Sequence, residues 1–409
     1  MTEQTDLVPK RRFKGFLNSH AWEQRELGEL GSVAMNKRIF KEQTAESGEV
    51  PFYKIGTFGG NPDAFISREL FEAYKAKYSY PKVGDILISA SGSIGRTVEY
   101  TGKDEYFQDS NIVWLKHDER LDSSFLKQFY SIVKWQGLEG STIKRLYNKN
   151  ILDTRISVPS LSEQKNIGQF FSLLDHLITL HQRKLEKTKA LKAAYLSEMF
   201  PAEGESEPKR RFVGFTGAWE QRELEKITLK IGSGKTPKGG ESSYVLEGIP
   251  LLRSQNVYDD LIDLNDVAYI TPQTDEEMKN SRVVKNDVLL NITGASIGRT
   301  AVYRHSSPAN VNQHVCIVRP AEGYSSDFIQ LNLTSPKGQQ QIDNNQAGGG
   351  REGLNFQQIG KMSFAFPSIE EQDQISELLK KLDHLITLHQ RKFEKLQNLK
   401  KAYLNEMFV

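Results

Sequence analysis

Two stretches of the chain carry apolar residues at intervals of three and four positions, which predicts two long amphipathic helices. Each stretch follows a proline, Pro159 or Pro367, and opens with serine and acidic residues typical of a helix N-terminus. With no glycine or proline in residues 169–200 or 368–409, each helix can run for about 35 to 40 residues, roughly 55 to 60 Å. The residues predicted to form the apolar seams are Ile167, Phe171, Leu174, Ile178 and Leu185 in the first helix and Ile375, Leu379, Leu382, Ile386 and Phe393 in the second.

A helix of this length cannot bury its apolar stripe alone, and the obvious partner is the other helix of the same chain. We expect the two helices to pair as an antiparallel coiled coil. Such pairing relates the two halves of the chain by a pseudo-twofold axis and places a globular domain at each end of a rigid spacer.

Short apolar runs bounded by polar residues or glycine predict strands outside these helices. Examples are residues 85–88, 287–290 and 315–318, and the first two are each followed by a glycine turn. The expected fold class is therefore α+β, a mixed α/β fold with two tandem domains separated by the two long helices. Trp22 and Trp219 take equivalent places in the two domains, and we expect both in the core.

The chain repeats itself with a period of about 200 residues, which indicates two copies of a whole domain and its connector. Lys-Arg-Arg-Phe occurs at residues 10–13 and 209–212, followed by Ala-Trp-Glu-Gln-Arg-Glu-Leu at 21–27 and 218–224. Ser-Ile-Gly-Arg-Thr occurs at 93–97 and 296–300. The longest match, Leu-Asp-His-Leu-Ile-Thr-Leu-His-Gln-Arg-Lys, lies in the two helices at 174–184 and 382–392.

Between these matched segments the copies diverge, most of all in residues 35–80 and 232–280. A shared scaffold with different variable parts is expected if each half reads a different target. The predicted order is an N-terminal segment (1–20), a first recognition domain (21–158), a central helix (159–200), a linker (201–217), a second recognition domain (218–366) and a C-terminal helix (367–409).

Composition fits a multidomain globular protein. The chain has 409 residues, of which 38% are hydrophobic and 26% charged, and its formal net charge of +2 assigns no partner. No apolar run approaches the about 20 residues that span a bilayer, so no membrane association is expected. The single cysteine, Cys316, lies in a predicted strand, and a protein without possible internal disulfides fits the cytoplasm.

Motifs for catalysis are incomplete, so we do not expect an enzyme. Gly-Ser-Gly-Lys-Thr at 232–236 resembles the end of a phosphate-binding loop, but Leu229 stands where the first glycine is needed and Pro237 follows. The histidines and carboxylates show no spacing typical of a metal or acid–base site. We expect no catalytic, cofactor-binding or metal-binding residues.

The loops that follow the paired strands are rich in side chains that bond to DNA. Arginine and amide side chains can pair with guanine or adenine, whereas lysine and hydroxyl groups mainly hold phosphates. The predicted contact residues are Lys37, Arg38, Lys54, Ser89, Ser91, Ser93, Arg96, Lys144, Arg145 and Tyr147 in the first copy and Lys235, Lys238, Arg253, Gln255, Asn256, Asn291, Thr293, Ser296, Arg299 and Arg351 in the second.

Several motifs together resemble the specificity subunits of type I restriction-modification enzymes across nearly the whole chain. These motifs are Ala-Trp-Glu-Gln-Arg-Glu-Leu, Gly-Lys-Thr-Pro at 234–237, Gly-Ile-Pro at 248–250, Gly-Ser-Ile-Gly at 92–95, and Pro-Ser-x-x-Glu-Gln at 159–164 and 367–372. The first copy departs from the pattern, since residues 48–53 lack the Gly-Lys-Thr-Pro motif.

The resemblance implies two target recognition domains of mixed α/β fold on a helical ruler that docks methyltransferase subunits. It implies a non-catalytic subunit that binds double-stranded DNA and works with two modification subunits and with restriction subunits that translocate DNA. S-adenosylmethionine, ATP and magnesium are then expected in those partners and not in this chain. The alternatives are a scaffold whose duplicated domains bind proteins and a stand-alone DNA enzyme with unrecognised motifs.

Overall fold

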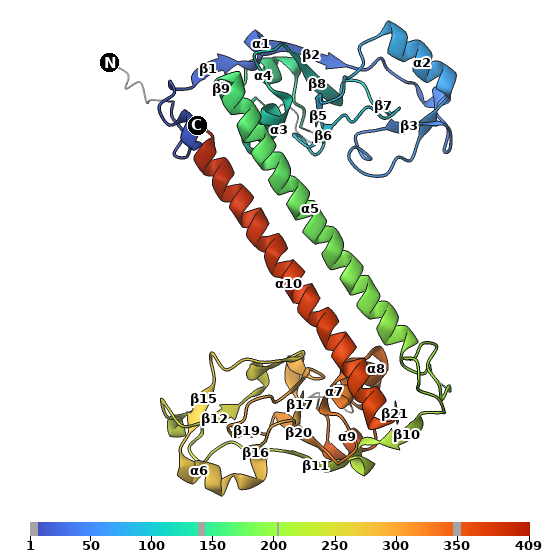
Figure 1. The fold of residues 1–409 in the computed structure, drawn as a ribbon, viewed down its shortest axis with the longest axis vertical. Coiled ribbons are helices and arrows are strands. Elements are labelled where there is room, and N and C mark those ends of the chain that lie inside the picture. Colours follow the sequence, from blue (N-terminus) through green and yellow to red (C-terminus); the bar gives the residue numbers. More distant parts are fainter. Residues whose placement is uncertain (1–6, 138–143, 203, 347–352) are drawn as a thin grey trace. The chain divides into compact units, whose positions relative to one another are not determined.

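The computed structural model describes residues 7–137, 144–202, 204–346 and 353–409. It divides into two compact units, unit 1 with residues 1–183 and 390–409 and unit 2 with residues 184–389. Each unit contains one α/β domain and part of each long helix, α5 (Leu161–Glu198) and α10 (Ile369–Met407) (Figure 1). The helices have 38 and 39 residues, within the length that the sequence predicts.

The first α/β domain is built on an antiparallel sheet in the order β2-β8-β5-β6. Its strands are β2 (Gly31–Met35), β5 (Ile86–Ser89), β6 (Thr97–Glu99) and β8 (Ile112–His117). A smaller sheet in the order β4-β3-β7 consists of β3 (Val50–Tyr53), β4 (Phe65–Ile66) and β7 (Tyr106–Phe107), with β3 and β7 parallel. The remaining elements are β1 (Glu23–Glu26), which pairs with β9 (Arg155–Val158), and helices α1 (Leu27–Leu30), α2 (Arg68–Lys77), α3 (Ser123–Ile132) and α4 (Asn148–Leu152).

The second α/β domain repeats this plan. Its main sheet has the order β11-β20-β17-β18, with β11 (Thr228–Ser233), β17 (Val288–Asn291), β18 (Thr300–Val302) and β20 (Val315–Pro320). A smaller sheet has the order β15-β12-β19-β16, with β12 (Ile249–Leu252), β15 (Ala268–Ile270), β16 (Arg282–Val283) and β19 (Ala309–Val311). The other elements are β10 (Glu220–Glu223), paired with β21 (Ser363–Phe366), the hairpin β13 (Val257–Tyr258) and β14 (Leu261–Ile262), and helices α6 (Pro272–Glu277), α7 (Ser326–Thr334), α8 (Pro336–Asn345) and α9 (Phe356–Gly360).

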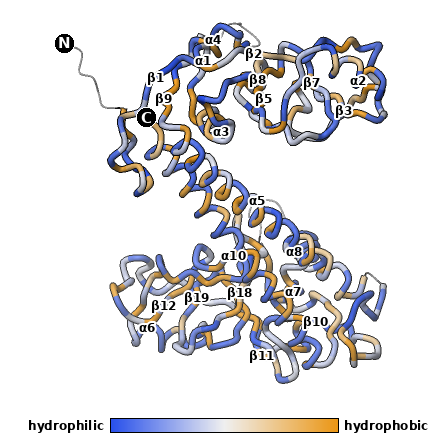
Figure 2. Tube along the Cα trace, turned by 45° about the horizontal axis from the view of Figure 1, so that its top comes forward, coloured by the Kyte–Doolittle hydropathy of each residue, from blue (hydrophilic) through white to orange (hydrophobic). Residues whose placement is uncertain are grey.

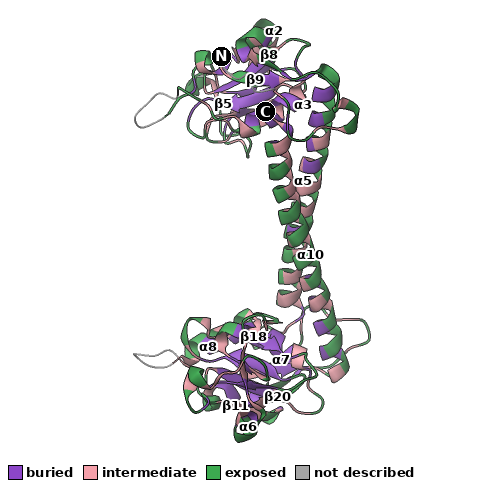
Figure 3. Cartoon of the chain, turned by 90° about the vertical axis from the view of Figure 1, so that its left-hand side faces the viewer, coloured by how far each residue is buried: buried purple, intermediate pink, exposed green. Residues whose placement is uncertain are grey.

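Both main sheets are buried on two faces, which explains their continuous apolar runs (Figure 3). In β5, Ile86 and Ile88 pack into the cluster that contains α3 and the long helices, whereas Leu87 packs toward the smaller sheet. In β17 the same alternation separates Val288 and Leu290 from Leu289. Successive side chains of a strand point to opposite faces, so each run supplies two cores.

The long helices pack together in both units, as the sequence predicts. In unit 1 the beginning of α5 and the end of α10 share one core, to which Phe171 and Leu404 belong. In unit 2 the beginning of α10 shares a core with Met199, just after α5, through Ile375 and Leu379. Within each unit the helices therefore run antiparallel. Figure 2 shows apolar and hydrophilic residues alternating along both helices.

The predicted seam residues are all at least partly buried. Ile167, Phe171, Leu174, Leu185, Ile375, Leu379 and Leu382 are buried, and Ile178, Ile386 and Phe393 are half-buried.

The two tryptophans lie in equivalent aromatic clusters, in agreement with their predicted place in the core. In unit 1 the Trp22 ring packs edge-on against Phe125, whose ring stacks on Phe408 at 5.0 Å. In unit 2 the Trp219 ring packs edge-on against Phe328, which stacks on Phe200 at 5.4 Å. Phe408 follows α10, while Phe200 follows α5. The core of the first domain is thus completed by the end of α10, and the core of the second domain by the end of α5.

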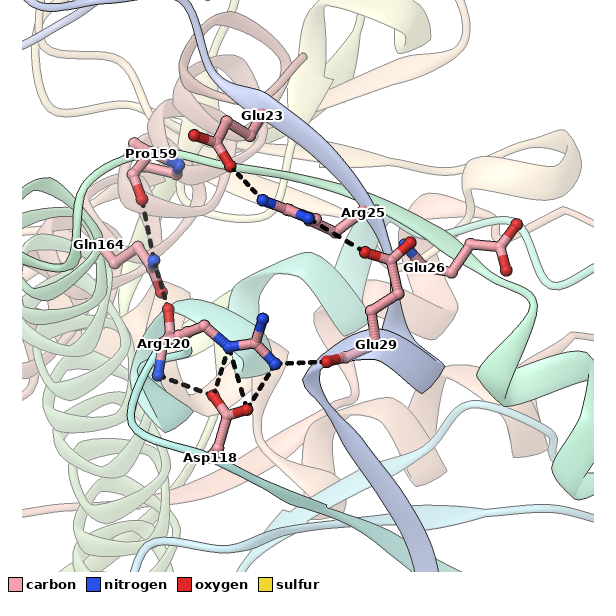
Figure 4. A network of polar contacts seen from close by, with 8 residues as sticks. All are labelled: Glu23, Arg25, Glu26, Glu29, Asp118, Arg120, Pro159 and Gln164. Atoms are coloured by element: carbon pink, nitrogen blue, oxygen red, sulfur yellow. Dashed lines mark hydrogen bonds and ion pairs between the residues drawn. The ribbon is translucent and has the colours of Figure 1, made fainter.

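The Pro-Ser-x-x-Glu-Gln motifs tie each domain to the helix that follows it. In unit 1 the Gln164 amide group donates hydrogen bonds to the carbonyls of Pro159 and Arg120, at 2.9 and 3.0 Å (Figure 4). Its Oε1 accepts from the backbone N–H of Asp122, at the start of α3, at 2.9 Å. In unit 2 Gln372 bonds in the same way to Pro367 and Ser325. These glutamines are therefore structural.

The Lys-Arg-Arg-Phe motifs hold the helix ends. Arg12 forms a bidentate ion pair with Glu163 of α5, at 2.8 and 2.6 Å, and Arg211 forms the same pair with Glu371 of α10. The Arg12 and Glu163 side chains are only 4% and 1% exposed. A paired charge satisfied in this way can remain buried.

Candidate nucleic-acid interface

The antiparallel order of the main sheet brings several loops to one edge. In the first domain β2 and β5 end at the edge where β8 and β6 begin, since each neighbouring pair runs antiparallel. In the second domain the same holds for β11, β17, β20 and β18. The loops at this edge carry many of the predicted contact residues.

Strand register identifies equivalent residues of the two domains at this edge. Val113 pairs with both Met35 and Ile88, and Cys316 pairs with both Ser233 and Leu290. We call these loops the polar edge. It consists of Lys37, Arg38, Ser91, Arg96, Asp109 and Asn111 in the first domain and of their equivalents Lys235, Thr236, Thr293, Arg299, Gln313 and His314 in the second. Asp109 and Gln313 are matched through the parallel strand pairs β3–β7 and β12–β19, because the first domain has one more residue between β7 and β8 than the second has between β19 and β20.

The register places the structural counterpart of the Gly-Lys-Thr-Pro motif in the first copy just after β2, and not at residues 48–53. Asn36 and Lys37 follow β2 where Gly234 and Lys235 follow β11. A Cβ atom on Gly234 would lie 1.6 Å from the carbonyl oxygen of Val311, which explains the glycine in the second copy. Because the first copy carries asparagine there, the motif cannot be recognised from sequence.

Four predicted contact residues are buried within or beneath this edge and shape its loops. Ser89 and Asn291, the last residues of β5 and β17, are 1% and 0% exposed. The Ser89 hydroxyl accepts from the backbone of Arg96, and the Asn291 amide donates to the carbonyls of Ser254 and Val257. Asn256 is 2% exposed, and its amide nitrogen donates to the backbone carbonyls of Asp263 and Asp266. These three are corrected from DNA contacts to loop supports.

Ser91 is the fourth such residue. It is 6% exposed, and its hydroxyl donates to Asn111 Oδ1 at 2.8 Å. The equivalent Thr293 is half-buried and bonds to His314 Nδ1 at 2.6 Å. Each hydroxyl therefore orients a second polar side chain, and the orienting role replaces the predicted contact for Ser91.

The two arginines of Ser-Ile-Gly-Arg-Thr are exposed at the polar edge. Arg96 donates to the carbonyl of Phe58 at 2.8 Å, and the Arg299 guanidinium lies over the Tyr258 ring at 5.6 Å. The preceding Gly95 and Gly298 have φ of +85° and +88°, a left-handed conformation that favours glycine. Ser93 in the same turn is exposed and Ser296 half-buried.

The lysines after the first strand of each sheet are exposed. The backbone of Lys37 is fixed by Tyr106, whose hydroxyl donates to the Lys37 carbonyl at 3.0 Å. Burial raises the pKa of Tyr106, so this hydroxyl stays protonated and remains a donor. Lys235 donates to the carbonyl of Glu277 at 3.2 Å, and Lys238 is exposed nearby in sequence.

The ends of the smaller sheets add a cation in each domain. Lys54 follows β3 and forms an ion pair with Asp63 at 2.8 Å. The equivalent Arg253 follows β12, and its guanidinium lies 5.9 Å from the centre of the Tyr244 ring. Gln255 is exposed and donates to Asp266 at 3.1 Å.

The remaining predicted contacts precede α4 or its equivalent α9. Lys144, Arg145 and Tyr147 are exposed. The backbone of Arg145 forms an isolated β-bridge with Ser91, and that of Gly353 forms one with Thr293. The segment therefore lies against the polar edge in both domains. Arg351 lies outside the described residues.

Besides Thr236, which the sequence analysis noted only as part of the Gly-Lys-Thr-Pro motif, four polar-edge residues were missed by sequence analysis: Asp109, Asn111, Gln313 and His314. They occupy short polar segments just before β8 and β20. The only available signal was their place before an apolar run, a pattern that many ordinary loops share.

Among the described residues, no group of three or more histidine, cysteine or acidic side chains is arranged to hold a metal ion. A search of the described helices for a span long and apolar enough to cross a membrane finds none.

Comparison with known proteins places these features in a family. The family model of the type I restriction modification DNA specificity domain matches twice, at residues 20–190 and 217–398. A Haemophilus influenzae protein, provisionally named a type I restriction enzyme specificity subunit, is 60% identical over 156 residues, which span 38% of this chain and 40% of that protein. The EcoBI specificity subunit of Escherichia coli is 23% identical over 90% of this chain and 80% of its own length.

A solved structure shares the fold. The type I restriction-modification S subunit of M. genitalium superimposes with a TM-score of 0.63 and 17% identity, and the match covers 98% of this chain and 99% of that one. The two matches to the family model cover most of the sequence, one in each half. The chain belongs to the family of type I restriction-modification DNA specificity proteins.

Proposed function

We propose that this chain reads a bipartite DNA target for a type I restriction-modification complex, with one half-site per α/β domain. The observation that carries this proposal is the polar edge. The two edges are built on equivalent strands but present different side chains, such as Asp109 against Gln313. Two copies of one scaffold with different hydrogen-bonding groups suit the reading of two different short sequences.

The side chains at the polar edge suit two kinds of DNA contact. Exposed lysines such as Lys37 and Lys235 suit phosphate contacts, which add affinity without sequence preference. Side chains with paired donors or acceptors, such as those of arginine and glutamine, suit base edges in the major groove. Both kinds are present in each domain.

The long helices are proposed to set the distance between the two half-sites. The helix α5 begins in unit 1 and ends in unit 2, and α10 runs back from unit 2 to unit 1. Because the two domains are joined by helices of defined length, the number of unread base pairs between half-sites is expected to be fixed.

The proposed partners are double-stranded DNA, two methyltransferase subunits that dock on this chain, and restriction subunits that join the full complex. Chemistry belongs to those partners. They are proposed to bind S-adenosylmethionine, ATP and magnesium, while this chain supplies recognition alone. The cytoplasm, where the DNA target lies, is the proposed location.

The test is a map of methylated adenines in DNA from cells that carry the chain with its modification subunits. A bipartite motif with a fixed gap is the expected result. Replacing residues 232–355 with the corresponding segment of another family member should change one half-site only. The matched replacement of residues 35–147 should change the other. A change of both half-sites by either exchange, or a continuous motif, would contradict the proposal.

A further inference from the structure

One pair of positions at the polar edge differs sharply in chemistry between the two domains. Arg38 and Thr236 are equivalent, because each is the third residue after its strand, β2 or β11. Asp109 and Gln313 are equivalent, because each is the second residue after the strand that pairs in parallel with β3 or β12. In both domains the two members of the pair contact each other.

In the first domain the pair is a cation and a carboxylate. The Arg38 Nε lies 3.3 Å from Asp109 Oδ2. The Asp109 side chain is 19% exposed and the Arg38 side chain 62%. The carboxylate therefore sits below and orients the guanidinium. The ion pair uses the Nε group, and the two terminal nitrogens offer donors side by side.

In the second domain the pair is a hydroxyl and an amide. Thr236 Oγ1 donates to Gln313 Oε1 at 2.6 Å. Gln313 Nε2 lies 3.2 Å from His314 Nε2, and His314 Nδ1 lies 2.6 Å from Thr293 Oγ1. Because an amide nitrogen can only donate, His314 Nε2 must accept and its proton sits on Nδ1, facing Thr293. In this arrangement the amide accepts through Oε1 and donates through Nε2.

Gln313 is exposed, and its amide retains free capacity after these bonds. Oε1 keeps one lone pair and Nε2 keeps one hydrogen. An adjacent acceptor and donor match the N6 amino group and N7 of adenine, whereas two adjacent donors, as on Arg38, match O6 and N7 of guanine.

We infer that these two positions determine one base of each half-site: Arg38, oriented by Asp109, reads a guanine, and Gln313, oriented by Thr236 and His314, reads an adenine. The inference rests on the proposed function and adds the residues and bases of that reading. Arg38 was among the predicted contacts, but its partner and the whole Gln313 network follow only from the structure.

The experiment uses the full chain produced with its modification subunits, with methylated sites mapped across genomic DNA. Gln313→Ala should relax one adenine of one half-site, and Arg38→Ala one guanine of the other. The preference for the named base should fall by about 5- to 150-fold, the range for a bidentate contact. The double variant Thr236→Arg with Gln313→Asp should shift that position from adenine toward guanine.

Each single variant has a matched control, in which an exposed residue of the same type is replaced in the same unit but away from the polar edge. The controls are Gln340→Ala on α8 and Arg155→Ala on β9, and both should leave the motif unchanged. Thermal unfolding of each variant reports folding, and the single variants carry the test if the double variant does not fold.

The outcomes separate this inference from the proposed function. A bipartite motif that all three edge variants leave unchanged at every base overturns the inference and keeps the function. Relaxation at bases other than guanine and adenine overturns the base assignment. If the unaltered chain with its modification subunits gives no sequence-specific methylation, the proposed function itself is overturned.

Discussion

Lys192 on α5 donates a hydrogen bond to Asp383 on α10, with Nζ 2.5 Å from Oδ1. In unit 1 Lys400 on α10 donates to Asp175 on α5 at 2.6 Å. The two lysines are 208 residues apart in the sequence, and so are the two aspartates. The duplicated helices thus meet through the same contact in exchanged roles, once in each unit. This reciprocity fixes the register of antiparallel pairing at two places.

The ion pair in unit 2 should contribute a measurable but small coupling. Its side chains are 27% and 30% exposed, so water screens the charges, and we expect a coupling of about 0.5 to 1 kcal/mol. A double-mutant cycle of Lys192→Ala and Asp383→Ala, followed by thermal unfolding, measures it. Additive effects of the two substitutions would show that the contact adds no stability.

Removal of residues 404–409 should destabilise unit 1 selectively. The deletion takes Leu404 and Met407 from the core of unit 1 and the Phe408 ring from its stack on Phe125. Loss of one large buried side chain alone costs about 2 to 5 kcal/mol. Hydrogen exchange should therefore accelerate in β5 and β8 but not in β17 and β20. Deletion of the exposed Val409 alone is the control.

Breaking the buried ion pair of the first Lys-Arg-Arg-Phe motif should cost about 3 to 5 kcal/mol. Arg12→Ala leaves the Glu163 carboxylate buried without its partner, since that side chain is 1% exposed. The double variant Arg12→Met with Glu163→Gln removes both charges and should be less harmful. Equal losses in the two variants, measured by unfolding in urea, would argue that packing and not the uncompensated charge sets the cost.

The long helices were predictable because their apolar spacing is regular and uninterrupted, as the burial of Ile167 and Ile375 shows. The polar edge was only partly predictable. Ser89 and Asn291 are polar residues in glycine-rich neighbourhoods, but they end central strands and are therefore buried. Gln313 gave no signal, because its role depends on Thr236, which is distant in sequence and close in the fold.

Cys316 should resist alkylation in the folded chain. It lies in β20 at 0% exposure, and burial raises the pKa of its thiol to about 12. At pH 8 only about one thiol in 10,000 is then the reactive thiolate. Mass spectrometry after treatment with iodoacetamide should show an unmodified chain under native conditions and full labelling in denaturant. Rapid labelling of the native chain would contradict the burial of this strand.

The length of the two long helices is expected to set the gap between the half-sites. Insertion of four residues after Leu185 and four after Phe393, which are equivalent in the duplicated helices, adds about one turn, or roughly 6 Å, to both. Matched insertions keep Lys192 opposite Asp383 and Lys400 opposite Asp175, whereas an insertion in one helix alone shifts the register and should destabilise the pairing. Because one base pair rises about 3.4 Å along DNA, the gap in the methylated motif should grow by one or two base pairs. Both half-site sequences should stay the same, since the polar edges are untouched. An unchanged gap in the doubly extended chain would show that something other than the helices determines the spacing.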